Sequence, residues 1–66
     1  MTIKQAIKKI EHLVPENERT DGHAWASNGD ARGYATWAIY YARRNRLSSV
    51  MFFVTEALFL EKQEAR

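Results

Sequence analysis

The sequence contains no cysteine and only one proline and three glycines in 66 residues. Without cysteine the chain can form neither a disulfide bond nor a thiolate metal site, and a reducing, cytoplasmic setting is the expectation. With so few prolines and glycines, few points in the chain force a helix to end. The proline and two of the three glycines fall in residues 15–29, which we expect to be an irregular connection.

The sequence also lacks an apolar stretch long enough to cross a bilayer, which takes about 20 residues. Its longest apolar run, residues 50–60, is interrupted by Thr55 and Glu56 and is followed by a charged tail. At the N-terminus, lysines are spread among apolar residues, whereas a secretory signal has a basic segment before an unbroken apolar one. We therefore expect no signal peptide and no contact with a membrane.

Residues suited to catalysis or metal binding are few and poorly spaced. His12 and His23 are the only histidines, and they lack the paired spacing of a structural zinc site. Asp21, His23 and Ser27 could be drawn as a nucleophilic site, but no sharp turn or pair of oxyanion donors accompanies them. The NGDARG segment matches no phosphate-binding loop, because no strand precedes it and no lysine follows. We expect no enzymatic activity, no cofactor, no metal and no small-molecule substrate.

Apolar residues recur at helical spacing in three stretches, and no stretch alternates as a strand would. The expected helices cover about residues 2–14, 30–45 and 49–63, with room for a short fourth helix in the connection 15–29. The sequence therefore predicts an all-α fold for residues 1–66, a single small bundle of three main helices that is completed by dimerisation.

Several residues mark the ends of these helices. Thr2 can cap the first helix, and Pro15 prevents the helix from continuing. In the connection, Trp25 is the only large apolar residue, and we expect it to anchor this segment on the core. Short polar side chains that could cap the later helices are Asn28 or Asp30 for the second and Ser48 or Ser49 for the third.

On a helical wheel the second helix separates into three faces. Tyr34, Trp37 and Tyr41 cluster on one face. Beside it runs a stripe of small residues that would let another helix approach closely, namely Ala31, Ala35, Ala38 and Ala42. The far side is expected to carry Arg32, Thr36, Ile39 and Arg43.

The third helix is apolar over more of its circumference than one core contact requires. A broad arc is expected to face the core, made of Val50, Phe53, Val54, Ala57, Leu58 and Leu60, with Met51 at its edge. Phe52 and Phe59, seven positions apart, fall on the opposite side near Thr55. Either the helix is central and covered on both sides, or these phenylalanines contact another chain.

The size of the chain favours contact with another chain. A domain of about 60 residues buries only about 60% of its unfolded surface, so covering both sides of one helix is difficult. We expect an interface formed by Phe52, Phe59, Met51 and Thr55, with a homodimer as the simplest form and an unidentified protein as a further partner. The expected function is that of a small non-enzymatic regulatory or inhibitory protein. Size alone suggests an origin in a phage or another mobile element.

Nucleic-acid binding is the alternative hypothesis. The net charge is only +2 at pH 7, but residues 31–46 hold four arginines and no acidic residue. The basic face would consist of Arg32, Arg43, Arg44 and Arg46, with Tyr40 as a stacking or hydrogen-bonding contact. Helix-end electrostatics is the competing explanation for these arginines. The third helix is too apolar to serve as the recognition helix of a helix-turn-helix.

Overall fold

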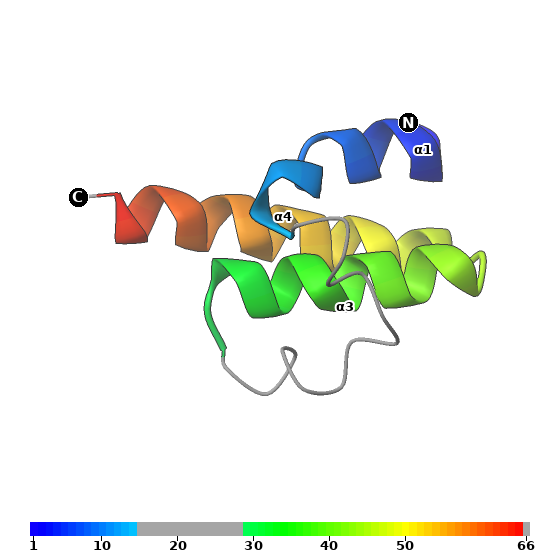
Figure 1. Ribbon diagram of the computed structural model, residues 1–66. Helices are drawn as coiled ribbons and strands as arrows, with labels where there is room; N and C mark the ends of the chain where they lie inside the picture. The colour runs from blue at the N-terminus through cyan, green and yellow to red at the C-terminus, as the bar shows by residue number, and fades with distance from the viewer. Residues whose placement is uncertain (15–28, 66) are drawn as a thin grey trace.

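The computed structural model describes residues 1–14 and 29–65. It contains helix α1 (Ile3–Lys8), the short 3-10 helix η1 (Glu11–Leu13), helix α3 (Ala31–Arg43) and helix α4 (Leu47–Glu64). No strand occurs in these two ranges, so the all-α prediction is confirmed for them. Figure 1 shows α3 and α4 side by side as an antiparallel pair, with α1 and η1 lying across one side of the pair.

Helix α1 begins at the predicted cap. The Thr2 side chain accepts a hydrogen bond from the Gln5 backbone N–H at 3.1 Å, and the Gln5 side chain accepts one from the Thr2 backbone N–H at 2.9 Å. This reciprocal capping box supplies partners for two donors that the first turn of a helix leaves unpaired.

The prediction of one continuous helix over residues 2–14 is wrong, because α1 ends at Lys8. Lys4 and Lys8 repel each other at a spacing of four, which weakens the helix. Val14 has an extended backbone (φ −127°, ψ 108°), as expected for a residue that precedes a proline. After Lys8 the chain turns and continues through η1. In this arrangement the side chains of Ile10 and Val14 are fully buried.

Helix α3 starts at Asp30, one of the two predicted caps. The Asp30 carboxylate accepts a hydrogen bond from Gly33 N–H at 2.7 Å. A second carboxylate, that of Glu64 at the end of α4, accepts from Ala31 N–H at 2.8 Å. Both negative groups lie at the positive end of the α3 dipole, where they stabilise the helix. The Glu64 bond also ties the end of α4 to the start of α3.

A tight turn joins α3 to α4. Asn45 adopts a left-handed conformation with φ 56°. Its N–H donates to Ala42 O and the Arg46 N–H donates to Tyr41 O, each at 3.1 Å. These two bonds form a Schellman motif, which satisfies carbonyls that the end of a helix leaves free. Because the turn is complete at Arg46, α4 begins at Leu47, and the predicted serine caps lie inside its first turn.

The core lies between α3, α4 and the N-terminal segment. Its buried residues are Ala6, Ile10, Val14, Ala35, Ala38, Ile39, Val50, Val54 and Ala57. From the predicted stripe of small residues, Ala31, Ala35 and Ala38 are at most 1% exposed. Ala35 and Ala38 belong to the same core cluster as Val50 and Val54 of α4, and small side chains at such positions permit a close approach of two helices.

Two residues of α3 that were expected on its exposed side are buried. Ile39 is only 6% exposed and belongs to the core cluster with Ala6 and Ile10. It is buried because α1 and η1 pack against this side of α3, which a wheel of one helix cannot reveal. Thr36 is fully buried, and its hydroxyl donates to Arg32 O at 2.8 Å. That bond satisfies a polar group that would be costly to bury alone.

The predictions for residues 15–28 lie outside the described residues. They include the short fourth helix, the anchoring role of Trp25, and the candidate groups Asp21, His23 and Ser27. In the described ranges, none of the helices has the length and apolar character needed to cross a membrane.

Candidate interaction surface

The side of α4 opposite the core carries two exposed phenylalanines. Phe52 is 57% exposed and Phe59 is 56% exposed. The core side of the same helix presents Val50, Val54 and Ala57, which are at most 2% exposed. Residues seven apart on a helix differ by about 20° in direction and about 10 Å in height, so the two rings project from one line. We call this side of α4 the Phe52–Phe59 face.

The remaining residues of this face are mostly polar. The exposed ones are Ser48, Thr55, Lys62 and Gln63. Met51, which the sequence placed at the edge of the core arc and also assigned to the interface, is partly buried and packs against the core. Thr55 lies between the two phenylalanines in the sequence and is exposed, as a residue of the predicted interface must be. The face is therefore narrow, with two aromatic rings in a polar surround.

The Phe52 ring is supported from one side. It makes an edge-on contact with Phe53, with ring centroids 5.1 Å apart and an interplanar angle of 83°. Phe53 in turn stacks on Tyr41, with centroids 5.5 Å apart and an angle of 5°. Edge-to-face and offset-stacked pairs are favourable arrangements of aromatic rings. The position of the exposed Phe52 ring is thus linked to α3 through Phe53.

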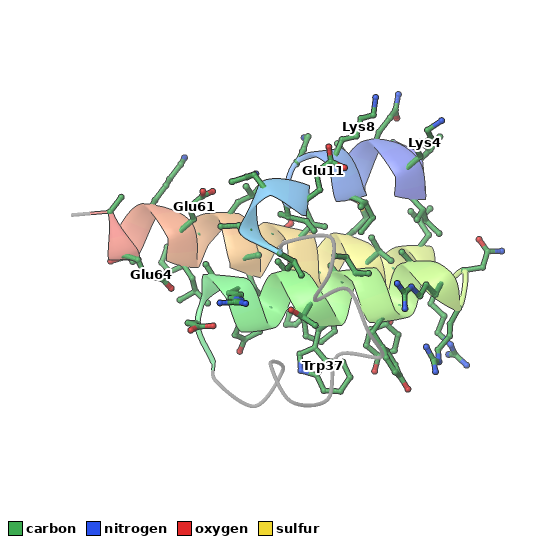
Figure 2. The ribbon with its side chains drawn as sticks, in the orientation of Figure 1. Lys4, Lys8, Glu11, Trp37, Glu61 and Glu64 are labelled. Carbon is green, nitrogen blue, oxygen red and sulfur yellow. The ribbon has the colours of Figure 1, made fainter. Side chains whose placement is uncertain are left out.

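Phe53 is the centre of an aromatic cluster that joins the two long helices. Its ring also lies 5.8 Å from that of Tyr34 and 5.9 Å from that of Trp37. Figure 2 shows Trp37 on the side of α3 that faces away from α1. The sequence predicted that Tyr34, Trp37 and Tyr41 share a face, and it assigned Phe53 to the core arc. The structure shows Phe53 packed against the core and also in contact with these three rings. One feature of the sequence could have predicted that Phe53 joins the aromatic cluster. On the helical wheel Phe53 lies next to Leu60, at the edge of the core arc.

The structure divides the predicted basic face into two parts. Arg43, Arg44 and Arg46 lie at the turn between α3 and α4, a site we call the arginine turn. Arg32 is in the first turn of α3, about 16 Å away along the helix. The structure therefore groups three of the four predicted arginines and separates the fourth.

Tyr40 lies in the last turn of α3, next to the arginine turn, and its ring already has a partner. The Arg44 guanidinium carbon lies 3.6 Å from the centroid of the Tyr40 ring, a cation–π contact. Arg44 Nη1 also donates to Tyr40 O at 3.2 Å. Trp37 and Tyr41 contact the same ring edge-on, at 5.3 Å and 5.1 Å between centroids. A nucleic-acid base that stacked on Tyr40 on the side of Arg44 would have to displace this guanidinium.

Charge is distributed unevenly along the molecule. Figure 2 shows Lys4 and Lys8 toward the end where α3 joins α4, and Glu61 and Glu64 toward the opposite end. The arginine turn is at the first of these ends. At the second end Glu61 contacts His12 of η1, with 2.6 Å between Oε2 and Nε2. This exposed pair holds η1 beside α4, although such pairs contribute little to stability.

The described residues contain no group of three potential metal ligands, and no pocket is found in this part of the chain. The features that remain for recognition are therefore surface features, namely the Phe52–Phe59 face, the aromatic cluster and the arginine turn. In comparisons with protein-family models, curated protein sequences and solved structures, nothing matches this chain.

Proposed function

We propose that this chain is a small regulatory or inhibitory protein that acts by binding another protein and not by catalysis. The proposed contact is the Phe52–Phe59 face, and the proposed assembly is a homodimer in which a second copy completes a helical bundle. One observation carries this proposal: two phenylalanines, each more than half exposed, project from one line on the side of α4 opposite the core.

The exposed rings can form the centre of an interface but are too small to form a whole one. An aromatic side chain offers roughly 200 Å², so four such rings, each a little over half exposed, would bury on the order of 450 Å². A standard protein interface buries about 1,200–2,000 Å² in total. Neighbouring residues of α4, such as Ser48, Thr55 and Gln63, would have to supply the rest. We therefore expect a dimer of moderate affinity whose energy is concentrated in the two rings.

The test replaces both rings with serine. The Phe52→Ser/Phe59→Ser variant should stay folded, because substitutions at exposed positions usually change stability by less than about 0.5 kcal/mol. Its mass in solution, measured by sedimentation equilibrium, should fall from dimer to monomer. The matched control is Leu47→Ser, which removes another exposed apolar residue of α4, 45% exposed, from a different side of the helix.

The proposed interface is wrong if the double variant keeps the dimer mass while its circular dichroism shows an intact helical fold. It is also wrong if Leu47→Ser dissociates the dimer equally, since the effect would then not belong to the Phe52–Phe59 face. If the native chain is monomeric up to millimolar concentration, the proposed homodimer is wrong.

Nucleic-acid binding is the second candidate, and the grouping of Arg43, Arg44 and Arg46 at one turn favours it. Guanidinium groups bind phosphates well, and such binding weakens as salt rises. Fluorescence anisotropy with labelled DNA and RNA at low salt should detect binding that Arg43→Ala/Arg46→Ala weakens at least tenfold. Arg32→Ala/Lys62→Ala is the matched control, because it also removes two positive charges, at the opposite end of the α3–α4 pair. Absence of binding at low salt excludes this function.

A further inference from the structure

We propose that the occupant of the Phe52–Phe59 face is α4 of a second copy, in antiparallel orientation, with Phe52 of each copy packed against Phe59 of the other. This inference rests on the proposed function and adds the identity and direction of the partner helix. It follows from the spacing of residues on the face and from the distribution of charge along the molecule.

The spacing makes the face self-complementary. If two copies of α4 run in opposite directions around an axis between Thr55 and Glu56, each Phe52 is level with Phe59 of the other copy. Ser48 is then level with Gln63. A two-fold axis brings the same surface of both copies together, so one helix supplies both halves of the contact. The two rings, about 10 Å apart along α4, would form two aromatic pairs on either side of the axis.

The charges select this direction over a parallel one. The start of α4 is next to the three cations of the arginine turn, and its end carries Glu61 and Glu64. Asp30 lies close to that end, since the Glu64 carboxylate binds the first N–H of α3. Lys62 and Arg32 reduce the negative charge there without reversing the difference between the ends. An antiparallel pair places the basic end of one copy beside the acidic end of the other.

A parallel pair would instead place six arginines together and align the dipoles of the two helices in the same direction. The antiparallel pair has two unfavourable features: the axis brings Glu56 of both copies near each other at the rim, and the exposed Lys62 of each copy comes near the arginine turn of the other. Glu56 is partly exposed, so this repulsion is screened by solvent. The same contact provides a measurement: Glu56→Gln should tighten the antiparallel dimer several-fold.

The decisive experiment uses the absence of cysteine in the natural sequence. Two single-cysteine variants are prepared, Ser48→Cys and Gln63→Cys, and each is oxidised alone and in an equal mixture. A disulfide needs Cα atoms within about 7 Å. In the antiparallel dimer, position 48 faces position 63, and the two copies of position 48 are about 22 Å apart along the helix. Only the mixture should therefore cross-link, giving a mixed dimer that mass spectrometry identifies.

The control carries Phe52→Ser/Phe59→Ser in both cysteine variants and should not cross-link. If Ser48→Cys and Gln63→Cys each cross-link with themselves, the helices are parallel, and this inference fails while the proposed interface stands. If the native chain has dimer mass but none of the three cysteine samples cross-links, the inference is overturned. It is also overturned if the Glu56→Gln variant dimerises no more tightly than the native chain. A monomeric native chain overturns self-association itself.

Discussion

At the scale of single residues, three polar side chains determine where the helices begin and end. Thr2 starts α1, Asp30 starts α3, and Asn45 ends α3 with a left-handed backbone. The sequence identified Thr2 directly and left Asp30 as one of two choices. It placed Asn45 at the end of the expected helix 30–45 without predicting its left-handed conformation. Asparagine tolerates this conformation better than other residues with a side chain, apart from aspartate.

Asn45→Ala is expected to destabilise the protein by about 1 kcal/mol, because alanine has a higher cost in the left-handed region. Asn45→Gly is the matched variant and should be neutral or stabilising, since glycine adopts φ 56° without strain. Urea unfolding followed by circular dichroism measures both. Equal stability of the two variants would show that the turn does not depend on this conformation.

Asp30→Ala should lower the free energy of unfolding by about 1 kcal/mol, the usual cost of losing an N-cap. The lost contact is the 2.7 Å hydrogen bond from Gly33 N–H. Asp30→Asn retains an acceptor and should lose clearly less. The comparison is made by urea unfolding at one pH and salt concentration. If alanine and asparagine cost the same, the charge of Asp30 matters and its capping bond does not.

At the scale of elements, the contact between α3 and α4 depends on small side chains. Ala35 and Ala38 are fully buried where the two helices meet, and the aromatic cluster lies at one edge of the same contact. The alanine spacing was visible in the sequence because it repeats every three or four residues. The pairing of that stripe with Val50 and Val54 is a tertiary result, supported by the short turn between the helices.

Ala38→Leu is expected to destabilise the protein by about 1–3 kcal/mol, because a larger side chain does not fit where the helices approach. The control is Ala65→Leu, which makes the same change in size at an exposed position after α4. Thermal unfolding should show a lower midpoint for the first variant and little change for the second. A normal midpoint for Ala38→Leu would mean that the two helices can separate at little cost.

At the scale of the whole molecule, association and stability should be coupled. A partner that binds only the folded chain raises its apparent stability by mass action. For a native dimer of chains this small, we expect the unfolding midpoint to rise by about 3–5 °C for each tenfold increase in concentration. The Phe52→Ser/Phe59→Ser variant should show no such dependence. Scans over a hundredfold range of concentration test this, and a constant midpoint for the native chain contradicts it.

Three features could be predicted from the amino-acid sequence: the helical class, the small-residue stripe of α3 and the side of α4 on which Phe52 and Phe59 lie. Each of these features follows from the periodicity of apolar or small residues within one segment. That periodicity does not depend on which other segments the helix contacts. The exposure of the two rings could not be read from the wheel, which left a covered central helix as an alternative. Their exposure depends on which side of the α3–α4 pair the N-terminal segment occupies.

The contacts between residues of different segments became visible in the folded structure alone. Folding placed α1 and η1 over Ile39, brought Glu64 to the start of α3 and His12 to Glu61, and made Phe53 the centre of the aromatic cluster. These contacts join residues far apart in the chain, and local spacing carries no information about them. They arise because a small domain buries its apolar surface wherever its few helices fit together.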